Sequence, residues 1–230
     1  MVVQGQTIGL LYLSWPELPE ITPEKQDLAM TVAEHIGLAL VNLTVRETLK
    51  NQSIRDPLTG LFNRRYLQES VEPEIQRASE QQQSIGMIIL DIDYFKRFND
   101  TFGHQAGDKV LQAIGQLLMR SIRGMDLPFR YGGEEFLVIL LGADLEMTQA
   151  KAEMLRSEVK LLQLEHNGQS LGTITSSFGV ACFPEHGQTL PKLVAVADAA
   201  LYEAKRLGRD RVVTPELMTT TNPELNHSDR

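Results

Sequence analysis

Apolar residues along most of this chain recur with two different periods, and each period predicts a different kind of element. Between residues 56 and 214, apolar runs rich in β-branched side chains predict strands, and apolar residues repeated every three or four positions predict helices. The predicted strands cover residues 84–92, 173–183 and 211–213. The predicted helices cover residues 58–78, 104–123, 146–164 and 190–207. The alternation indicates one α/β domain over residues 56–214, with helices packed on a sheet.

Residues 1–46 follow a different pattern. The apolar run from Thr7 to Leu13 predicts a buried strand, and a proline-bearing loop follows it. A helix is then predicted with Thr22 as N-cap and Pro23 in its first turn, and it carries one apolar stripe. The stripe consists of Leu28, Val32, Ile36, Leu40 and Leu43.

The helical pattern continues through a linker at residues 47–55, and Asp56–Pro57 ends it, because proline disfavours helical backbone in the residue before it. An apolar stripe on such a helix either pairs with a copy of itself or folds back on the preceding strand, and the sequence leaves both open. Residues 215–230 contain few apolar side chains, which predicts a disordered tail.

A turn with acidic residues lies between the second and third predicted helices. The run Arg130-Tyr-Gly-Gly-Glu-Glu-Phe136 has apolar stretches on both sides, which predicts a tight β-hairpin. Gly132 and Gly133 have no side chains, so a large anionic ligand can approach the main chain there. Carboxylates beside such an opening suit Mg²⁺ bound to a nucleotide phosphate.

Asp91 and Asp93 end the strand predicted at residues 84–92. Acids at the end of a buried strand are destabilising unless a cation or hydrogen bonds compensate their charge. The alternative is a pair of solvated residues where the strand leaves the sheet. The hairpin favours a site, because pairing it beside this strand brings Glu134 close to Asp91.

Composition narrows the classes of function. The chain has 230 residues, 42% of them hydrophobic, and a net charge of −8, which argues against a surface for binding a nucleic acid polymer. Its one cysteine, Cys182, lies in an apolar stretch and is expected to be a reduced core residue. No apolar run approaches the roughly 18–20 residues of a membrane span. We therefore expect a cytoplasmic chain without membrane contact.

The histidines follow no metal-ligand spacing, and no GxxxxGK[ST] phosphate loop is present.

Several blocks of sequence, in order, resemble one family. They are DPLTGLFNRR from Asp56, DIDYFKRFNDTFGHQAGD from Asp91, RYGGEEF from Arg130 and LYEAKRLGRD from Leu201. Together they resemble the GGDEF family, the diguanylate cyclases. The resemblance implies an α/β (α+β) domain of the nucleotidyl-cyclase, palm-like kind, with a mostly antiparallel central sheet flanked by helices. The strand and helix of residues 1–46 resemble the end of a GAF-type sensory domain, as a truncated or degenerate piece.

The resemblance also implies a metal site and catalytic residues. Asp91, the carbonyl of Ile92 and Glu134 would bind Mg²⁺ or Mn²⁺, and Glu135 is the candidate base or partner of the ligands. Asp93 is assigned to support rather than to ligation.

The family's substrate, GTP, gives roles to further residues. Guanine presents an N1–H and an N2 amino group side by side, which one carboxylate can accept, so Asp108 with Asn99 is a plausible guanine reader. A helix cap is the alternative for Asp108.

The remaining substrate-binding candidates are Phe95, Lys96, Gly132, Gly133, His104, Lys205 and Arg209. Phe95 and Lys96 would offer backbone N–H groups, and Gly132 and Gly133 would line the opening. Lys205 and Arg209, four apart on one helix face, would contact the triphosphate, or they merely favour the helix dipole. His104 is expected to make a local hydrogen bond or cap.

Arg123 and Asp126 match the family's site of product inhibition, with Arg77 as a secondary contact. An ion pair between residues three apart on a helix is the alternative for this pair. Met154 stands where the family often has another arginine, which puts the strength of inhibition in doubt.

The resulting prediction is a diguanylate cyclase that condenses two GTP into cyclic di-GMP and two pyrophosphates, with one GTP held by each half of a homodimer. Two rivals remain: a catalytically silent receptor for cyclic di-GMP, and a nucleotidyl cyclase that acts on a single nucleotide.

Overall fold

The computed structural model describes residues 2–3, 6–10, 12 and 22–217. The chain divides into two compact units, Met1–Ser53 and Ile54–Arg230.

The first unit contains one long helix, α1, Pro23–Ile54, which confirms the predicted helix and its end before Asp56. Its other elements are the short antiparallel strands β1, Val2–Val3, and β2, Gln6–Thr7. The buried strand predicted from Thr7 to Leu13 is wrong: pairing stops at Thr7, and Leu10 and Tyr12 are 92% and 87% exposed. An apolar run alone does not form a buried strand when no layer covers it.

The apolar stripe of α1 is solvent-exposed. Leu28 is 65% exposed and Leu43 56%, and Val32, Ile36 and Leu40 are exposed as well. The alternative in which the helix folds back on its own strand is therefore not what the structure shows. By length and composition, Pro23–Arg46 also meets the requirements for a membrane span, contrary to the expectation from the sequence. Glu34, His35 and Asn42 interrupt its apolar character.

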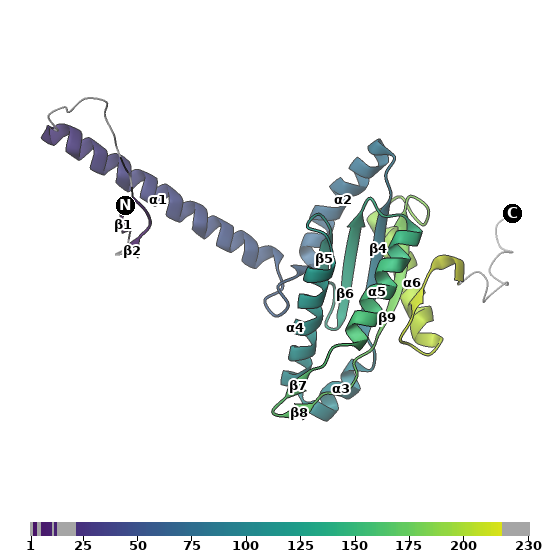
Figure 1. The fold of residues 1–230 in the computed structure, drawn as a ribbon. Helices are drawn as coiled ribbons and strands as arrows, with labels where there is room; N and C mark the ends of the chain where they lie inside the picture. Colours follow the sequence, from purple (N-terminus) through teal and green to yellow (C-terminus); the bar gives the residue numbers. More distant parts are fainter. Residues whose placement is uncertain (1, 4–5, 11, 13–21, 218–230) are drawn as a thin grey trace. The chain divides into compact units, whose positions relative to one another are not determined.

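The second unit is built on a six-stranded sheet in the order β10-β9-β4-β6-β5-β3 (Figure 1). The strands are β3, Phe62–Asn63; β4, Ile85–Ile92; β5, Leu127–Arg130; β6, Glu135–Leu141; β9, Ser176–Phe183; and β10, Val212–Val213. The four inner strands pair antiparallel, and only the outer pairs β10–β9 and β3–β5 are parallel. The predicted mostly antiparallel sheet is confirmed. A separate small hairpin joins β7, Glu165–His166, to β8, Gln169–Ser170.

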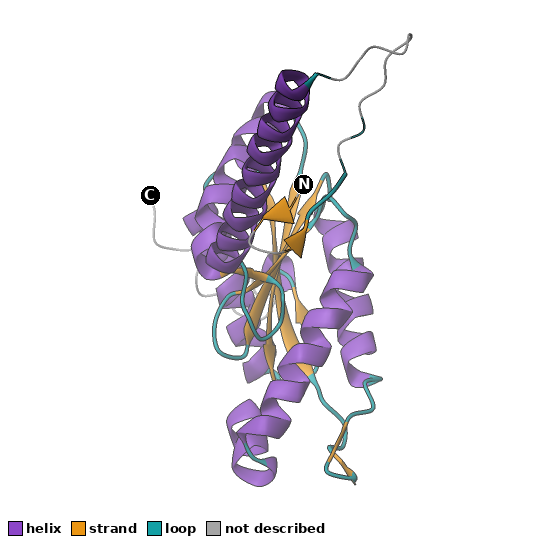
Figure 2. Ribbon diagram, turned by 90° about the vertical axis from the view of Figure 1, so that its left-hand side faces the viewer, coloured by secondary structure: helices purple, strands orange, loops and turns teal. Residues whose placement is uncertain are grey.

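Helices cover both faces of this sheet (Figure 2). They are α2, Arg64–Gln81; α3, Phe95–Phe102; α4, His104–Ser121; α5, Leu145–Lys160; and α6, Leu190–Arg206. Every residue of the central strand β4 is buried, and its side chains alternate between two cores. Ile88 and Leu90 pack with residues of α4 and α5, whereas Met87 and Ile89 pack with α2 and α6. The predicted α+β class is confirmed.

The first helix of this unit begins later than predicted, at Arg64 instead of residue 58. The carboxylate of Asp56 accepts hydrogen bonds from the backbone N–H and the hydroxyl of Thr59, at 2.9 and 2.7 Å, and these bonds favour a turn. Asn63 then caps α2 by accepting from the N–H of Tyr66 at 3.1 Å.

Two further predictions have mixed outcomes. Cys182 is a free, buried residue as expected, and burial raises the pKa of its thiol to about 11. The tail predicted to be disordered begins too early, because Pro215–Leu217 form a helical turn; residues 218–230 lie outside the described residues.

Helix α6 packs closely on strand β9 at one glycine. A Cβ atom added at Gly179 would come within 2.1 Å of the carbonyl oxygen of Ala197 and 2.3 Å of the backbone nitrogen of Leu201. No neighbouring side chain can move to relieve a clash with backbone atoms. Gly179 thus fixes the height of α6 above the sheet, and with it the position of Lys205 near the end of that helix.

Candidate active site

The acidic turn lies beside the carboxyl end of the central strand, as predicted. In the β4–β6 pairing, Asp91 faces Glu135 across the ladder, and the backbone N–H of Ile92 donates to the carbonyl of Glu134 at 3.3 Å. The turn is closed by the N–H groups of Tyr131 and Gly132, which both donate to the carbonyl of Glu135. Residues more than 40 positions apart in the chain are therefore held together by main-chain hydrogen bonds.

Asp91 is the buried acid of the site. Only 6% of it is exposed, and its Oδ2 lies 2.8 Å from Nζ of Lys205, which reaches it from α6. Burial raises the pKa of Asp91 above its ordinary value, and the hydrogen bond and charge of Lys205 oppose that shift only in part. Burial also raises the pKa of Glu134, and the negative charge of Asp91 adds to the effect. The two carboxylates thus form a site with excess negative charge.

Asp93 has another environment. Its carboxylate accepts hydrogen bonds from the hydroxyls of Thr175 and Ser177, at 2.8 and 2.7 Å, and from the backbone N–H of Asp210 at 3.1 Å. These bonds tie the end of β4 to the start of β9, to Thr175 just before it and to the turn after α6.

The predicted guanine-reading residues lie on α3 and α4. The Oδ1 atom of Asn99 is buried and has no hydrogen-bond partner among the residues that the structure describes. It lies against Gly107, where a Cβ atom would come within 2.0 Å of that oxygen. Asp108 is exposed and lies inside α4, which begins at His104 with Gly103 as N-cap, so the capping alternative for Asp108 is wrong. His104 is the exposed first residue of the helix.

The start of α3 presents backbone donors near Asp91. Tyr94 is the N-cap, with a left-handed backbone (φ 57°), and Phe95 and Lys96 are the first two helical residues. N–H groups in a first helical turn have no partner within the helix. Phe95 is buried and Lys96 exposed.

Arg209 reaches this region by a different route from the one predicted. It does not share a helix face with Lys205, because α6 ends at Arg206 and Gly208 turns the chain with φ 113°. The guanidinium carbon of Arg209 lies 4.2 Å from the centre of the Tyr94 ring, and Nη1 lies 3.2 Å from the Tyr94 hydroxyl. Its positive charge also acts on Asp91.

The residues predicted for product inhibition lie on two segments: Arg123 and Asp126 follow α4, and Arg77 is on α2. Asp126 is buried and accepts from the backbone N–H of Arg123 at 2.9 Å and of Leu141 at 3.2 Å. Since its contact with Arg123 is to the backbone, and Arg123 lies beyond the end of α4, the alternative of a helical ion pair is wrong. Arg123 itself is exposed. Arg77, on α2, pairs with Glu74 at 2.5 Å, and Met154 packs against the core.

Arg130 has a structural role that the sequence analysis missed. Its Nη1 lies 3.1 Å from both carboxylate oxygens of Asp56, and its Nη2 donates to the carbonyl of Gly133 at 2.8 Å. Asp56 lies two residues after the end of α1, and Gly133 belongs to the acidic turn. The sequence pattern at Asp56 indicates a helix end and a family block but not this partner, which is 74 positions away.

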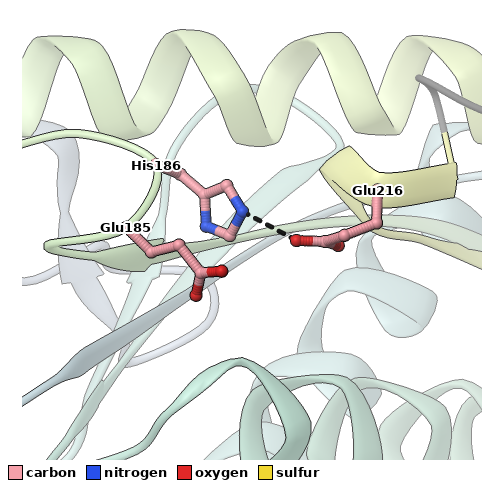
Figure 3. A group of neighbouring side chains, drawn as sticks. All are labelled: Glu185, His186 and Glu216. Carbon is pink, nitrogen blue, oxygen red and sulfur yellow. Dashed lines mark hydrogen bonds and ion pairs between the residues drawn. The ribbon is translucent and has the colours of Figure 1, made fainter.

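A second group of possible metal ligands lies away from this site. The ligand atoms of Glu185, His186 and Glu216 lie within 4.8 Å of one another (Figure 3). However, the backbone N–H of Cys182 donates to Nδ1 of His186 at 3.0 Å, which leaves the proton of a neutral ring on Nε2. That Nε2 then donates to Glu216 at 3.0 Å, so neither ring nitrogen has a lone pair free for a metal.

The charge of the site predicts a dependence of stability on pH. Because burial and neighbouring charge raise the pKa of Glu134 in the folded state, its charge destabilises the fold at neutral pH. As the pH falls, the folded protein takes up this proton before the unfolded chain does. We therefore expect Glu134→Gln to have the higher free energy of unfolding at about pH 7, with the difference from wild type shrinking toward about pH 5.

Urea unfolding without divalent cations at both pH values measures this difference, with the exposed Glu80→Gln as the control. A difference that stays constant or grows on acidification would contradict the assigned environment of Glu134.

Comparison with known proteins agrees with this geometry. Residues 53–211 match the family described as "Diguanylate cyclase, GGDEF domain". The chain is 42% identical over 166 residues to diguanylate cyclase DgcP of Pseudomonas aeruginosa, covering 72% of this chain and 24% of that protein. It is 39% identical over 215 residues to the response regulator PleD of Caulobacter vibrioides, covering 91% of this chain and 47% of PleD.

Among solved structures, the coiled coil and GGDEF domain of DgcB from Caulobacter crescentus, in complex with c-di-GMP, is similar with a TM-score of 0.74 and 32% identity. That match covers 81% of this chain and 98% of the other. The chain thus belongs to the diguanylate cyclase GGDEF-domain family. It spans between about a quarter and a half of the curated relatives DgcP and PleD.

Proposed function

We propose that this chain is a diguanylate cyclase, which condenses two GTP molecules into cyclic di-GMP and two pyrophosphates. The observation that supports this most strongly is the intact acidic turn held against Asp91, with Lys205 beside both carboxylates. A buried acid beside a half-buried one, both with raised pKa values and next to a lysine, suits a site for metal-bound phosphate. Because the substrate is GTP, we place the chain in the cytoplasm.

The donor set fits a divalent cation. The negative charge of Asp91 raises the proton affinity of Glu134, and a cation with a preference for oxygen ligands would relieve this repulsion. In this proposal Asp91, the carbonyl of Ile92 and Glu134 hold Mg²⁺ or Mn²⁺. When bound, the metal would neutralise phosphate charge and lower the pKa of the attacking 3′-hydroxyl.

The protein's own residues position the substrate. Glu135 is the proposed base or the partner of Glu134; its backbone is fixed by the pairing with Asp91. The unpartnered Oδ1 of Asn99 supports a role for Asn99 and Asp108 in binding guanine, because a buried acceptor is stabilised when a donor arrives. Phe95 and Lys96 offer N–H groups to the phosphates, and Lys205 and Arg209 offer charge. Gly132 and Gly133 line the approach, and His104 lies at its edge.

Formation of the 3′–5′ bonds requires two such sites to face each other, and we propose a homodimer. The support is the exposed apolar stripe of α1. The solved DgcB structure comprises a coiled coil together with its GGDEF domain. We further propose that residues 1–46 are the end of a GAF-type domain, and that 47–55 form a helical linker to a catalytic domain over 56–214.

Product inhibition is proposed at Arg123, Asp126 and Arg77. The support is the exposure of Arg123 and the resemblance to domains whose structures contain c-di-GMP. Both oxygens of Asp126 already accept backbone hydrogen bonds, so a guanine edge would have to share them.

Incubation with GTP and Mg²⁺, with identification of products by mass across a series of protein concentrations, tests the proposal. We expect cyclic di-GMP, formed faster than in proportion to protein concentration. A cyclic mononucleotide would indicate a single-nucleotide cyclase. No product from a protein that binds cyclic di-GMP would indicate a receptor and contradict the assigned roles of Asp91 and Glu134.

A further inference from the structure

Arg209 lies in a turn with an unusual backbone conformation. Arg209 and Asp210 both have positive φ angles, of 64° and 44°, directly after Gly208. Residues with side chains rarely adopt such angles, and two in succession persist only where surrounding contacts hold them. The contacts that hold this turn are therefore part of what places the Arg209 side chain.

Asp210 makes most of those contacts. Its carboxylate forms ion pairs with Arg156 and with Lys160, the latter at 2.6 Å, and both partners lie on α5. Its carbonyl accepts from Nη1 of Arg156 at 3.3 Å, and its N–H donates to Asp93 at 3.1 Å. Burial alone would raise the pKa of Asp210, but the hydrogen bonds from Lys160 and Arg156 outweigh it and lower the pKa, so the group is charged at neutral pH.

These bonds connect α5 to the part of the site where we propose that Arg209 contacts the phosphates of GTP. Arg156 and Lys160 hold Asp210, Asp210 fixes the turn, and the turn directs Arg209 over the ring of Tyr94. We propose that Asp210 and Arg156 are positioning residues, which hold Arg209 where its guanidinium meets the triphosphate of GTP. The inference rests on the proposed function, since it requires that GTP binds beside Tyr94 and Asp91.

A binding measurement separates positioning from general stability. Asp210→Ala removes the carboxylate, whereas Asp210→Asn keeps a side chain that tolerates the left-handed region and one acceptor. Arg156→Gln weakens the same contact without altering any residue of the turn itself. Glu153→Gln is the matched control, because Glu153 pairs with Arg156 on α5 and does not contact the turn.

Affinities for a non-hydrolysable GTP analogue and for guanosine are measured by calorimetry on product-free protein. We expect Asp210→Ala and Arg156→Gln to weaken binding of the GTP analogue about five- to tenfold, the size of one charge-assisted contact. Guanosine affinity is expected to stay unchanged, Asp210→Asn to recover most of the loss, and Glu153→Gln to match wild type.

A double-mutant cycle that combines Asp210→Ala with Arg209→Ala tests whether Asp210 affects GTP binding through Arg209. If Asp210 acts through Arg209, then Asp210→Ala has no further effect in the Arg209→Ala background. An unchanged affinity for the GTP analogue, an equal loss for guanosine, or a full effect without Arg209 would each overturn the inference alone. Wild-type protein that binds no GTP analogue would overturn the proposed function, and the inference with it.

Discussion

Glu134→Ala is expected to reduce formation of cyclic di-GMP by at least about a hundredfold while the fold remains intact. The side chain lies in the turn between β5 and β6, half-buried, and its charge is unfavourable beside Asp91. Removing it takes away a proposed metal ligand and relieves repulsion at the same time. The variant should therefore be at least as stable as wild type at neutral pH, although it is almost inactive.

Cyclic di-GMP is identified and quantified by mass, and thermal unfolding is followed by circular dichroism on the same preparations. Glu80→Ala is the control, because Glu80 is exposed near the end of α2 and has no proposed role in the site. Wild-type turnover in Glu134→Ala would refute the assignment of Glu134 as a metal ligand. Loss of activity together with loss of the folded signal would instead assign Glu134 a structural role.

Charges on the apolar stripe of α1 are expected to have the second-largest effect. Ile36→Asp combined with Leu40→Asp places two carboxylates where we propose that a second helix packs. The protein should become monomeric, and activity per molecule at low micromolar concentration should fall about tenfold or more, because two half-sites no longer meet. Binding of a GTP analogue by each domain should be unchanged.

Sedimentation and product formation are followed over the same range of protein concentrations. Thr31→Asp combined with Asn42→Asp adds the same two charges on the polar side of α1 and is expected to behave as wild type. A monomeric variant with full activity at every concentration would contradict the two-site mechanism. A variant that stays dimeric would show that the stripe is not the contact.

The sequence predicted the parts of the site that depend on local pattern. Apolar runs located the strands that carry Asp91 and the acidic turn, because alternation and turn residues are properties of neighbouring positions. The pairing of the hairpin beside the strand of Asp91 was also predictable, since a tight hairpin has few ways to join a sheet. Register, which sets Asp91 opposite Glu135, is a property of the assembled sheet.

What the sequence could not provide are contacts between distant segments and the backbone of turns. Arg209 was expected on the face of a helix that in fact ends three residues earlier, because the positive φ of Gly208 and its two successors is not visible in an apolar pattern. The hydrogen bond that Asp126 accepts from the N–H of Leu141, in β6, was likewise not visible in the sequence. Asp56 and Arg130 give the same lesson, since either residue alone has no signal for the other.

The order of the sheet also determines when this domain can first exist during synthesis. Strand β4 needs β6 on one side and β9 on the other, and the pairing of Ile85 with Phe183 closes the sheet only after most of the chain has been made. Asp91 lies in that same central strand and faces Ser177 on the late side. A nascent chain that stops before β9 therefore has an open edge on its central strand and an incomplete site. Contacts so distant in sequence form slowly, so the growing polypeptide exposes apolar strands until its last helices emerge from the ribosome.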